Sequence, residues 1–335
     1  MATFEHMPEA LKHLGFTGRA VLAPMSGVTD VPFRRVAASF GAGLVVSEMV
    51  ASEAFVVGHE EMRLKAESEG IEVPVVQLAG RQPRWMAEAA RLAEQSGAAI
   101  IDINVGCPAK KVVSGLSGSA LMRDLDLAKQ LITATVGATR VPVTLKMRLG
   151  WDRETINAPE LARIAESEGV RLVTVHGRTR NQFYKGKADW AAIHAVRDAV
   201  SLPLVANGDL TTPEAAPDML KASGADAVMI GRGAYGAPWV VGQTASYLKT
   251  GSYEDAPHGT QLVDTICVHY EAMLSHYGVA LGVRQARKHL DWYLQASGRE
   301  VAPQDRLRLM RSEEPSDVLD AVKALFARGS QRKAA

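Results

Sequence analysis

The stretch VPVVQLAGRQPRWMAEAARLAEQSGAAIIDINVGCP, residues 73–108, contains two apolar runs separated by a helical segment. The runs at 73–80 and 100–108 are rich in Val and Ile and are continuously apolar rather than alternating. That pattern is typical of strands that are buried on both faces of a parallel sheet. Between them, residues 83–97 carry apolar side chains at helical spacing and finish at a glycine, which commonly ends a helix. The stretch predicts one strand–helix–strand unit.

Similar apolar runs recur over the first two-thirds of the chain. Together with the two above, they occupy residues 20–25, 44–49, 73–80, 100–108, 141–150, 172–179, 202–209 and 227–233. Eight strands alternating with helices fit a closed TIM (β/α)8 barrel better than an open doubly wound sheet, which usually has fewer strands. Nearly every run ends in polar or glycine-rich residues, and the active site of such a barrel lies at the C-terminal ends of its strands. We therefore predict an α/β fold with a TIM barrel over residues 1–247.

The pattern becomes entirely helical after residue 247. Helices are predicted over residues 260–278 and 282–298, and two shorter ones are predicted to begin near Pro303 and Pro315. The stretch 249–257, rich in Gly, Ser, Asp and Pro, separates these helices from the barrel. We predict a helical C-terminal domain over residues 248–335, with a short basic tail, GSQRKAA at 329–335, that we expect to be mobile.

Composition excludes several classes of protein. The 335 residues carry a formal net charge of only +1, so binding to a nucleic acid would need a local basic patch. We expect neither a signal peptide nor a membrane span, because the N-terminus lacks a basic head with an apolar core and no apolar stretch is long enough. The two cysteines, Cys107 and Cys267, cannot form a disulfide framework or a four-thiolate metal site. We expect a cytoplasmic monomer without a metal, with Cys267 in a helical core.

Cys107 is the strongest chemical signal. The motif DINVGCP, residues 102–108, ends the fourth predicted strand and brings Asn104 and Cys107 to the barrel mouth, with Lys110 and Lys111 nearby. A lone cysteine is most often a buried structural residue, but a strand-end position favours a chemical role here. A nucleophilic cysteine needs a neighbouring base, and none is evident, whereas an ordinary thiol is mostly protonated at neutral pH. The motif therefore indicates a thiol with a chemical role that is mostly protonated at neutral pH.

The strand-end motifs, in their order, resemble those of the tRNA-dihydrouridine synthase family. They are LAPMSGVTDVPFRR (22–35), VVSEM (45–49), VQLAG (76–80), DINVGCP (102–108), LKMRLGW (145–151), VHGRTR (175–180), NGD (207–209) and GRG (231–233), followed by RKHLDWY (287–293). The resemblance covers roughly residues 20–295 and is greatest to the bacterial B-type branch. It implies an FMN-dependent enzyme that reduces the C5–C6 double bond of a uridine in the D-loop of tRNA, with position 17 suggested. NADPH, or alternatively NADH, would be the reductant.

The chemistry of uracil explains what such a site must supply. C6 is the electron-poor end of an enone, so reduced flavin N5 can deliver hydride there, and C5 must then receive a proton, which the resemblance assigns to Cys107. By the same resemblance, the flavin ring contacts Pro24, Met25, Ser26, Gln77, Lys146 and His176. A lysine beside flavin N1 and O2 favours the anionic reduced form.

The flavin phosphate is expected after the last two strands, the usual phosphate position of a TIM barrel. The residues expected there are Asn207, Gly208, Asp209, Gly231 and Arg232. GRGAYG at 231–236 also satisfies the G-x-G-x-x-G pattern of dinucleotide-binding proteins. The acids that follow it lie in a linker and not at the end of a second strand, so a mononucleotide phosphate loop is the better interpretation.

Asn104 and Arg178 are the candidates for binding the uracil. A basic strip on the predicted helix at 282–298, comprising Arg284, Arg287 and Lys288, is the candidate for binding tRNA phosphates. Two alternatives remain open at this point. One is a flavin-dependent barrel reductase of small enones or pyrimidines, whose turnover should survive truncation after residue 247. The other is a non-enzymatic RNA-binding regulatory protein.

Overall fold

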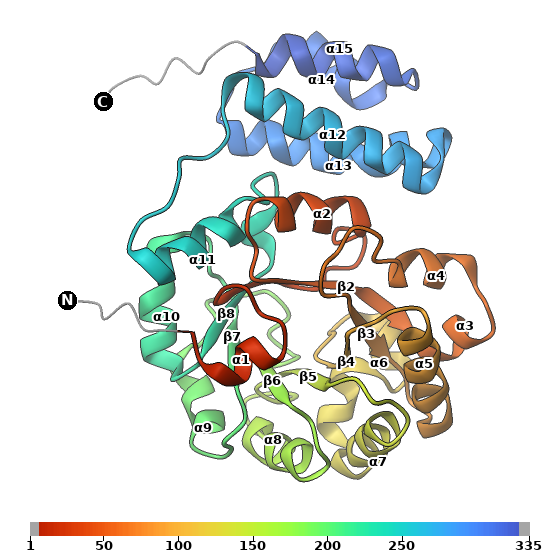
Figure 1. The fold of residues 1–335 in the computed structure, drawn as a ribbon, viewed down its shortest axis with the longest axis vertical. Coiled ribbons are helices and arrows are strands. Elements are labelled where there is room, and N and C mark those ends of the chain that lie inside the picture. The colour runs from red at the N-terminus through yellow and green to blue at the C-terminus, as the bar shows by residue number, and fades with distance from the viewer. Residues whose placement is uncertain (1–6, 328–335) are drawn as a thin grey trace.

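The computed structural model describes residues 7–327, and its first part is a closed barrel of eight parallel strands in chain order (Figure 1). The strands are β1 (Ala20–Leu22), β2 (Leu44–Ala51), β3 (Val75–Ala79), β4 (Ile100–Val105), β5 (Val143–Arg148), β6 (Leu172–His176), β7 (Leu204–Asn207) and β8 (Ala227–Ile230). Each coincides with one predicted run. The TIM barrel is therefore confirmed, and it closes through pairing of Val21 in β1 with Met229 in β8.

The helices that follow the strands cover the outside of the barrel. They are α2 (Val31–Ser39), α3 (Ser52–Val56), α4 (Glu60–Ala66), α5 (Pro83–Gln95), α6 (Lys110–Ser114), α7 (Leu125–Val136), α8 (Ala158–Ser167), α9 (His194–Arg197), α10 (Ala216–Ser223) and α11 (Val240–Thr250). A short N-terminal helix, α1 (Glu9–His13), adds Leu11 to the apolar cluster inside the barrel, which also contains Val21 and Val205. Side chains on the other face of the strands form a second cluster with the surrounding helices.

Four further helices form the C-terminal region, at the upper edge of Figure 1. They are α12 (Gly259–Tyr277), α13 (Val279–Ser297), α14 (Pro303–Arg311) and α15 (Pro315–Phe326), so the predicted helical region is confirmed. One difference is that α13 begins at Val279 and not at 282. The single residue between α12 and α13 is Gly278, whose φ of 76° permits the sharp reversal. The predicted basic tail lies outside the described residues.

The C-terminal region is built around an apolar cluster that includes Ile266, Tyr270 and Phe326 and extends to Trp239 at the start of α11. Cys267 is half-buried and packs against this core. The expected boundary between residues 247 and 248 falls inside α11, which continues to Thr250 and is capped by Gly251. No helix among residues 7–327 combines the length and apolar character needed to cross a membrane.

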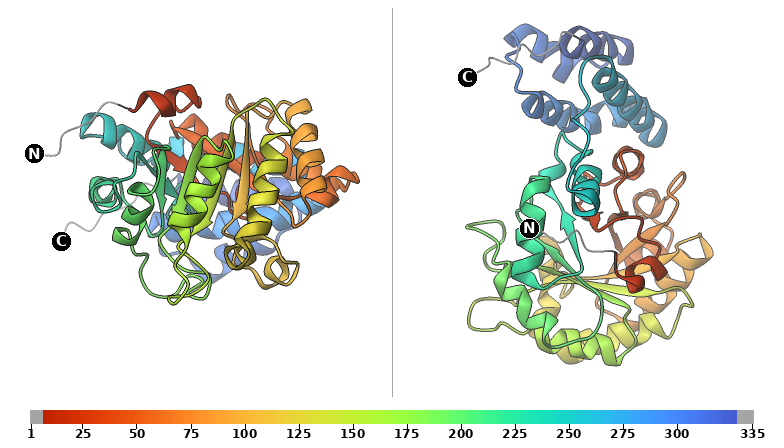
Figure 2. Two further views of the ribbon diagram at one scale, coloured as in Figure 1. Left: turned by 90° about the horizontal axis from the view of Figure 1, so that it is seen from below. Right: turned by 60° about the vertical axis from the view of Figure 1, so that its left-hand side comes forward.

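The C-terminal region docks on one side of the barrel, where α12 packs against α2 (Figures 1 and 2). Phe33 of α2 contacts the rings of His269 and His289, with centroid distances of 5.7 and 5.4 Å. Trp292 of α13 stacks on Tyr235, which follows β8, at 4.0 Å and an interplanar angle of 11°. A Cβ on Gly236 would lie 2.1 Å from the Trp292 carbonyl oxygen, so only glycine permits this approach. The interface is therefore close-packed.

Candidate active site

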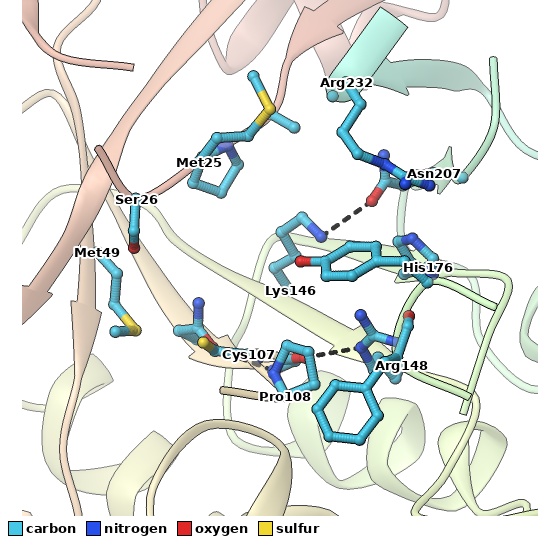
Figure 3. Close-up of a pocket in the computed structure, with 18 of the residues that line it drawn as sticks. Met25, Ser26, Met49, Cys107, Pro108, Lys146, Arg148, His176, Asn207 and Arg232 are labelled. Atoms are coloured by element: carbon cyan, nitrogen blue, oxygen red, sulfur yellow. Dashed lines mark hydrogen bonds between the residues drawn. The ribbon is translucent and has the colours of Figure 1, made fainter. Parts of the chain in front are cut away.

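A cavity of about 630 Å³ opens at the C-terminal ends of the barrel strands (Figure 3). Its size is that of a typical cofactor or small-ligand site. The residues predicted to contact a flavin all line it: Pro24, Met25, Ser26, Gln77, Lys146, His176, Asn207, Gly208, Asp209, Gly231 and Arg232. Cys107 and Asn104 line the same cavity. The structure therefore brings together side chains from β1, β3, β4, β5, β6, β7 and β8 or the loops that follow them.

The floor of the cavity is cationic. Lys146 donates a hydrogen bond from Nζ to Asn207 Oδ1 at 3.1 Å, and its burial, reinforced by the charge of Arg148, lowers its pKa from 10.5 to about 8. Burial, together with the same arginine, lowers the pKa of His176 well below its usual value. His176 is therefore a neutral imidazole. Its Nδ1 is buried and has no hydrogen-bond partner within residues 7–327.

Arg148 is a cavity residue that the sequence analysis missed. It is buried, and its guanidinium donates to the carbonyl oxygens of Gly106, Thr179 and Phe183, each at 2.9 Å. It thereby fixes the turn before Cys107 against the loop after β6. A signal was available, because Arg148 lies two residues beyond Lys146 on one strand, and such residues point to the same side of a sheet.

The turn after β4 places the Cys107 thiol at the cavity (Figure 3). Asn104 Oδ1 accepts hydrogen bonds from the backbone N–H of Gly106 at 3.1 Å and of Cys107 at 2.9 Å. The Cys107 carbonyl oxygen accepts from the backbone N–H and the hydroxyl of Ser119, at 3.1 and 2.9 Å. Asn104 Nδ2 donates to Gln77 Oε1 at 2.7 Å. Most of the Asn104 amide is therefore used to shape the turn.

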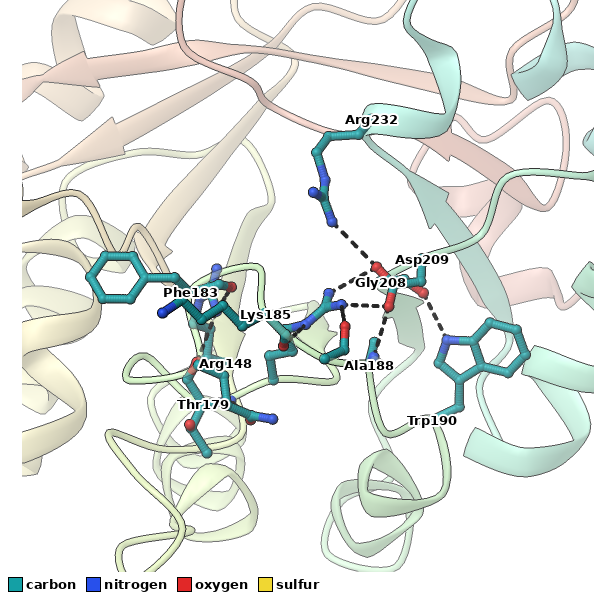
Figure 4. A network of polar contacts seen from close by, with 12 residues as sticks. Arg148, Thr179, Phe183, Lys185, Ala188, Trp190, Gly208, Asp209 and Arg232 are labelled. Atoms are coloured by element: carbon teal, nitrogen blue, oxygen red, sulfur yellow. Dashed lines mark hydrogen bonds and ion pairs between the residues drawn. The ribbon is translucent and has the colours of Figure 1, made fainter.

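The structure does not support the prediction that Arg178 binds uracil. Its side chain is 1% exposed, does not line the cavity, and forms an ion pair with Asp209 through two hydrogen bonds of 2.8 and 2.6 Å. Asp209 also accepts from the backbone N–H of Ala188 at 2.8 Å and lies 3.4 Å from Arg232, as Figure 4 shows for the labelled residues. Arg178 therefore holds Asp209 and the loop after β6 in place, because four of its five N–H groups bond to Asp209 and to the carbonyl oxygens of Lys185 and Gly186.

The basic strip on α13 lies outside the cavity. Arg284 is exposed, whereas Arg287 and Lys288 are half-buried. Lys288 Nζ donates to Gln285 Oε1 at 2.8 Å. Burial lowers the pKa of Lys288, while the neighbouring carboxylates of Asp30 and Glu48 oppose that shift. Lys288 therefore faces acids of its own chain.

Two other basic residues of the C-terminal region form ion pairs within the chain. Arg306 pairs with Asp291, and Arg308 pairs with Asp317. Among residues 7–327, no group of three or more His, Cys, Asp or Glu side chains is arranged to hold a metal ion.

Comparisons with known proteins agree with the motifs. The family model described as dihydrouridine synthase matches residues 21–328. A "Probable tRNA-dihydrouridine synthase" of Rhizobium leguminosarum bv. phaseoli is 55% identical and covers 90% of this chain and 92% of its own length. A protein of the same description from Rhodobacter capsulatus is 51% identical over 98% of this chain and 100% of its own length. "tRNA-dihydrouridine synthase B" of Xanthomonas axonopodis pv. citri is 45% identical over 92% of each chain.

Solved structures agree on the fold. Histamine dehydrogenase from Rhizobium sp. 4-9 superposes with a TM-score of 0.55 over 94% of this chain and 63% of that chain, at 11% sequence identity. At that identity the likeness shows a shared barrel fold and nothing further. The family is established by the sequence relatives, which cover nearly their whole length, and it is the one that the strand-end motifs predict. The chain belongs to the dihydrouridine synthase family.

Proposed function

We propose that this protein is an FMN-dependent tRNA-dihydrouridine synthase that reduces the C5–C6 double bond of a D-loop uridine, at position 17, with NADPH or NADH as the reductant. We further propose that it acts as a monomer in the cytoplasm. The observation that carries the proposal is that one cavity is lined both by the Cys107 thiol and by every residue expected to contact the flavin.

The residues around the cavity suit a flavin mononucleotide. His176 Nδ1 is a buried polar atom without a partner in the described chain, so a ligand with polar ring atoms would satisfy it. Lys146, Arg148 and Arg232 supply positive charge for a phosphate and for an anionic reduced ring. Bound FMN would supply the hydride that reduces C6 of the uracil.

Cys107 would then deliver its Sγ proton to C5 of the uracil. Its backbone is held on both sides by Asn104 and Ser119, so the thiol is presented to the cavity in a defined position. The cations Lys146 and Arg148 stabilise the negative charge that develops on the uracil as the hydride arrives. Two roles of the protein follow, namely to orient a thiol acid and to provide a cationic floor.

A uridine must leave its stack to reach this cavity, and the D-loop of tRNA offers bases that are already exposed. Arg284 on α13 is exposed and is the best placed of the three for a tRNA phosphate, whereas Arg287 is half-buried and its Nε is buried. Lys288 would contribute less, since it faces Asp30 and Glu48. Fewer residues of the basic strip are therefore proposed to contact tRNA than the sequence predicts.

The test uses the flavin-loaded chain, NADPH and tRNA from cells that lack dihydrouridine. We expect the tRNA to gain two hydrogen atoms at one D-loop uridine, detected by mass spectrometry. Free uridine and small enones should stay unreduced, and their turnover at a comparable rate would support the small-molecule reductase instead. Cys107→Ala should retain flavin but reduce uridine on the order of 10²-fold more slowly. Cys267→Ala is the matched control, because it removes the other thiol outside the cavity.

A further inference from the structure

Asp102 is a buried acid that the proposed chemistry does not use. It lies on β4, is 4% exposed, and is in register with Gln77 on β3 and Thr144 on β5. Burial raises its pKa, and hydrogen bonds from those two neighbours oppose the shift. A carboxyl group is rarely buried so deeply unless hydrogen bonds compensate for its lost hydration.

The hydrogen bonds of Asp102 form a chain that ends at Cys107. Asp102 Oδ2 accepts from Gln77 Nε2 at 2.7 Å, and its Oδ1 accepts from the Thr144 hydroxyl at 2.6 Å. Gln77 Oε1 in turn accepts from Asn104 Nδ2 at 2.7 Å. Asn104 Oδ1 then accepts from the backbone N–H of Cys107 at 2.9 Å. Three side chains therefore connect the interior of the barrel to the reactive turn.

The orientation of the two side-chain amides in this chain is fixed at both ends, by the Asp102 carboxylate and by the backbone N–H of Cys107. A side-chain amide can turn over and exchange its oxygen and nitrogen, so Gln77 alone could present either atom to its neighbour. Because an Asp102 oxygen faces Gln77, the amide nitrogen of Gln77 must point toward Asp102. The Gln77 Oε1 atom is then left to accept from Asn104. If Gln77 turned over, its NH2 would meet the NH2 of Asn104. Asn104 would then have to turn as well, and its NH2 would face the N–H of Cys107. Both arrangements place donor against donor.

We propose that Asp102 is a positioning residue that sets the orientation of the Gln77 and Asn104 amides and, through them, the turn that presents the Cys107 thiol. The inference rests on the proposed function, because it concerns the acid of that reaction. It assigns Asp102 no contact with the substrate. Asp102 is accordingly absent from the cavity lining.

The first test measures the thiol directly in the flavin-loaded, full-length chain. Asp102→Leu keeps the branching at Cγ and removes both acceptor oxygens, so we expect the alkylation rate of Cys107 by iodoacetamide to change by about threefold or more. The rate at Cys267, read from the same digest by mass spectrometry, should stay unchanged. Asp102→Asn keeps an oxygen for Gln77 and should restore the Cys107 rate. Thr144→Val, which removes the donor on the other side of the carboxylate, should leave the rate within about twofold.

The second test separates positioning from general damage. Single-turnover uridine reduction by the pre-reduced enzyme is measured for Asp102→Leu in the wild-type and Cys107→Ala backgrounds. If Asp102 acts through Cys107, the loss should be about tenfold or more in the first background and under about twofold in the second. An equal loss in both, or an unchanged Cys107 alkylation rate in the folded variant, overturns the inference. An inactive wild-type enzyme would instead overturn the proposed function.

A fallback variant keeps the test decisive. Asp102→Leu leaves the Thr144 hydroxyl buried without a partner, which can prevent folding. The double variant Asp102→Leu/Thr144→Val removes both the carboxylate and the hydroxyl that donates to it. Its Cys107 alkylation rate should differ by about threefold or more from that of Thr144→Val alone.

Discussion

We predict that His269 on α12 makes the seam between the barrel and the C-terminal helices sensitive to acid. It is 1% exposed, lies between Phe33 and His289, and places Nδ1 3.1 Å from the Tyr293 hydroxyl. Its Nε2 is buried without a hydrogen-bond partner in the described chain. Burial lowers its pKa from 6.5 to about 3. Folding therefore keeps this ring neutral where an unfolded histidine would be charged.

The sign and size of the effect follow from linkage. A base whose folded pKa is lowered contributes stability that is complete above its unfolded pKa of 6.5 and is lost progressively as the pH falls toward about 3. With these two values, the loss is close to zero at about pH 7.5 and reaches about 2 kcal/mol at about pH 5. Such a loss is a large fraction of the stability of an ordinary domain.

The perturbation is His269→Asn, which cannot titrate but can still present an oxygen near the Tyr293 hydroxyl. Between about pH 7.5 and pH 5, the free energy of unfolding of the wild type should fall by about 2 kcal/mol more than that of the variant. Urea denaturation followed by tryptophan fluorescence and circular dichroism at each pH measures both. Asp30 is present in both proteins, so its own titration cancels in the difference, whereas the titration of His289, whose ring contacts His269, is coupled to the substitution.

The control is His13→Asn. This substitution also removes a histidine, but the His13 side chain is 76% exposed and lies away from the seam. Its unfolding free energy should follow that of the wild type across the pH range. Parallel curves for the wild type and His269→Asn would refute the reasoning, because they would mean that the buried ring binds a proton as readily as the unfolded one. A difference of the opposite sign would refute it equally.

Three further predictions concern the cavity and its supports. Lys146→Met should stabilise the flavin-free protein by up to about 3 kcal/mol below about pH 8, and this gain should disappear as the pH rises toward 10.5. The same variant should bind FMN more weakly. Urea denaturation measures the stability, and fluorescence titration measures the FMN affinity. Trp292→Ala removes the stack on Tyr235 and should cost about 3 kcal/mol in unfolding free energy and weaken FMN binding, so unchanged FMN affinity would contradict the coupling. Arg178→Met leaves Asp209 with only the longer contact to Arg232 as a cationic partner and should cost up to about 3 kcal/mol in unfolding free energy. The KM for tRNA of the flavin-saturated enzyme should stay unchanged, and a selective rise in that KM would instead support Arg178 as a substrate ligand.

The fold could be predicted from the sequence because each barrel strand is a short run buried on both faces. Such runs need no long-range information, as the agreement of 172–179 with β6 and of 227–233 with β8 shows. The cavity residues could be predicted for a related reason. In a closed parallel barrel the C-terminal ends of all strands meet at one mouth, so polar residues at strand ends converge wherever they lie in the chain.

Partners across loops could not be predicted in this way. Arg178 follows β6 like the cavity residue His176, but its guanidinium is taken by Asp209, 31 residues further along the chain. Both charged residues can be read in the sequence, but nothing in the sequence indicates that Arg178 and Asp209 form an ion pair. Lys288 is a similar case, because helical spacing places it beside Arg284, whereas packing turns it toward Asp30 and Glu48. A basic side chain is available to a ligand only if folding leaves it without an acid.

The docking of α12 and α13 also changes how the small-molecule alternative can be tested. If the C-terminal region were an appendix used only to hold RNA, truncation after residue 247 would leave a small-molecule reductase intact. Truncation would, however, expose Phe33, which is 1% exposed in the whole chain, and would remove the ring that supports Tyr235 at the cavity wall. Loss of turnover in the truncated protein would therefore follow under either function. Point variants at Arg284 avoid this ambiguity, because that exposed side chain can be replaced without opening the seam. If the C-terminal region binds tRNA, replacing Arg284 should raise the KM for tRNA, and no such rise is expected otherwise.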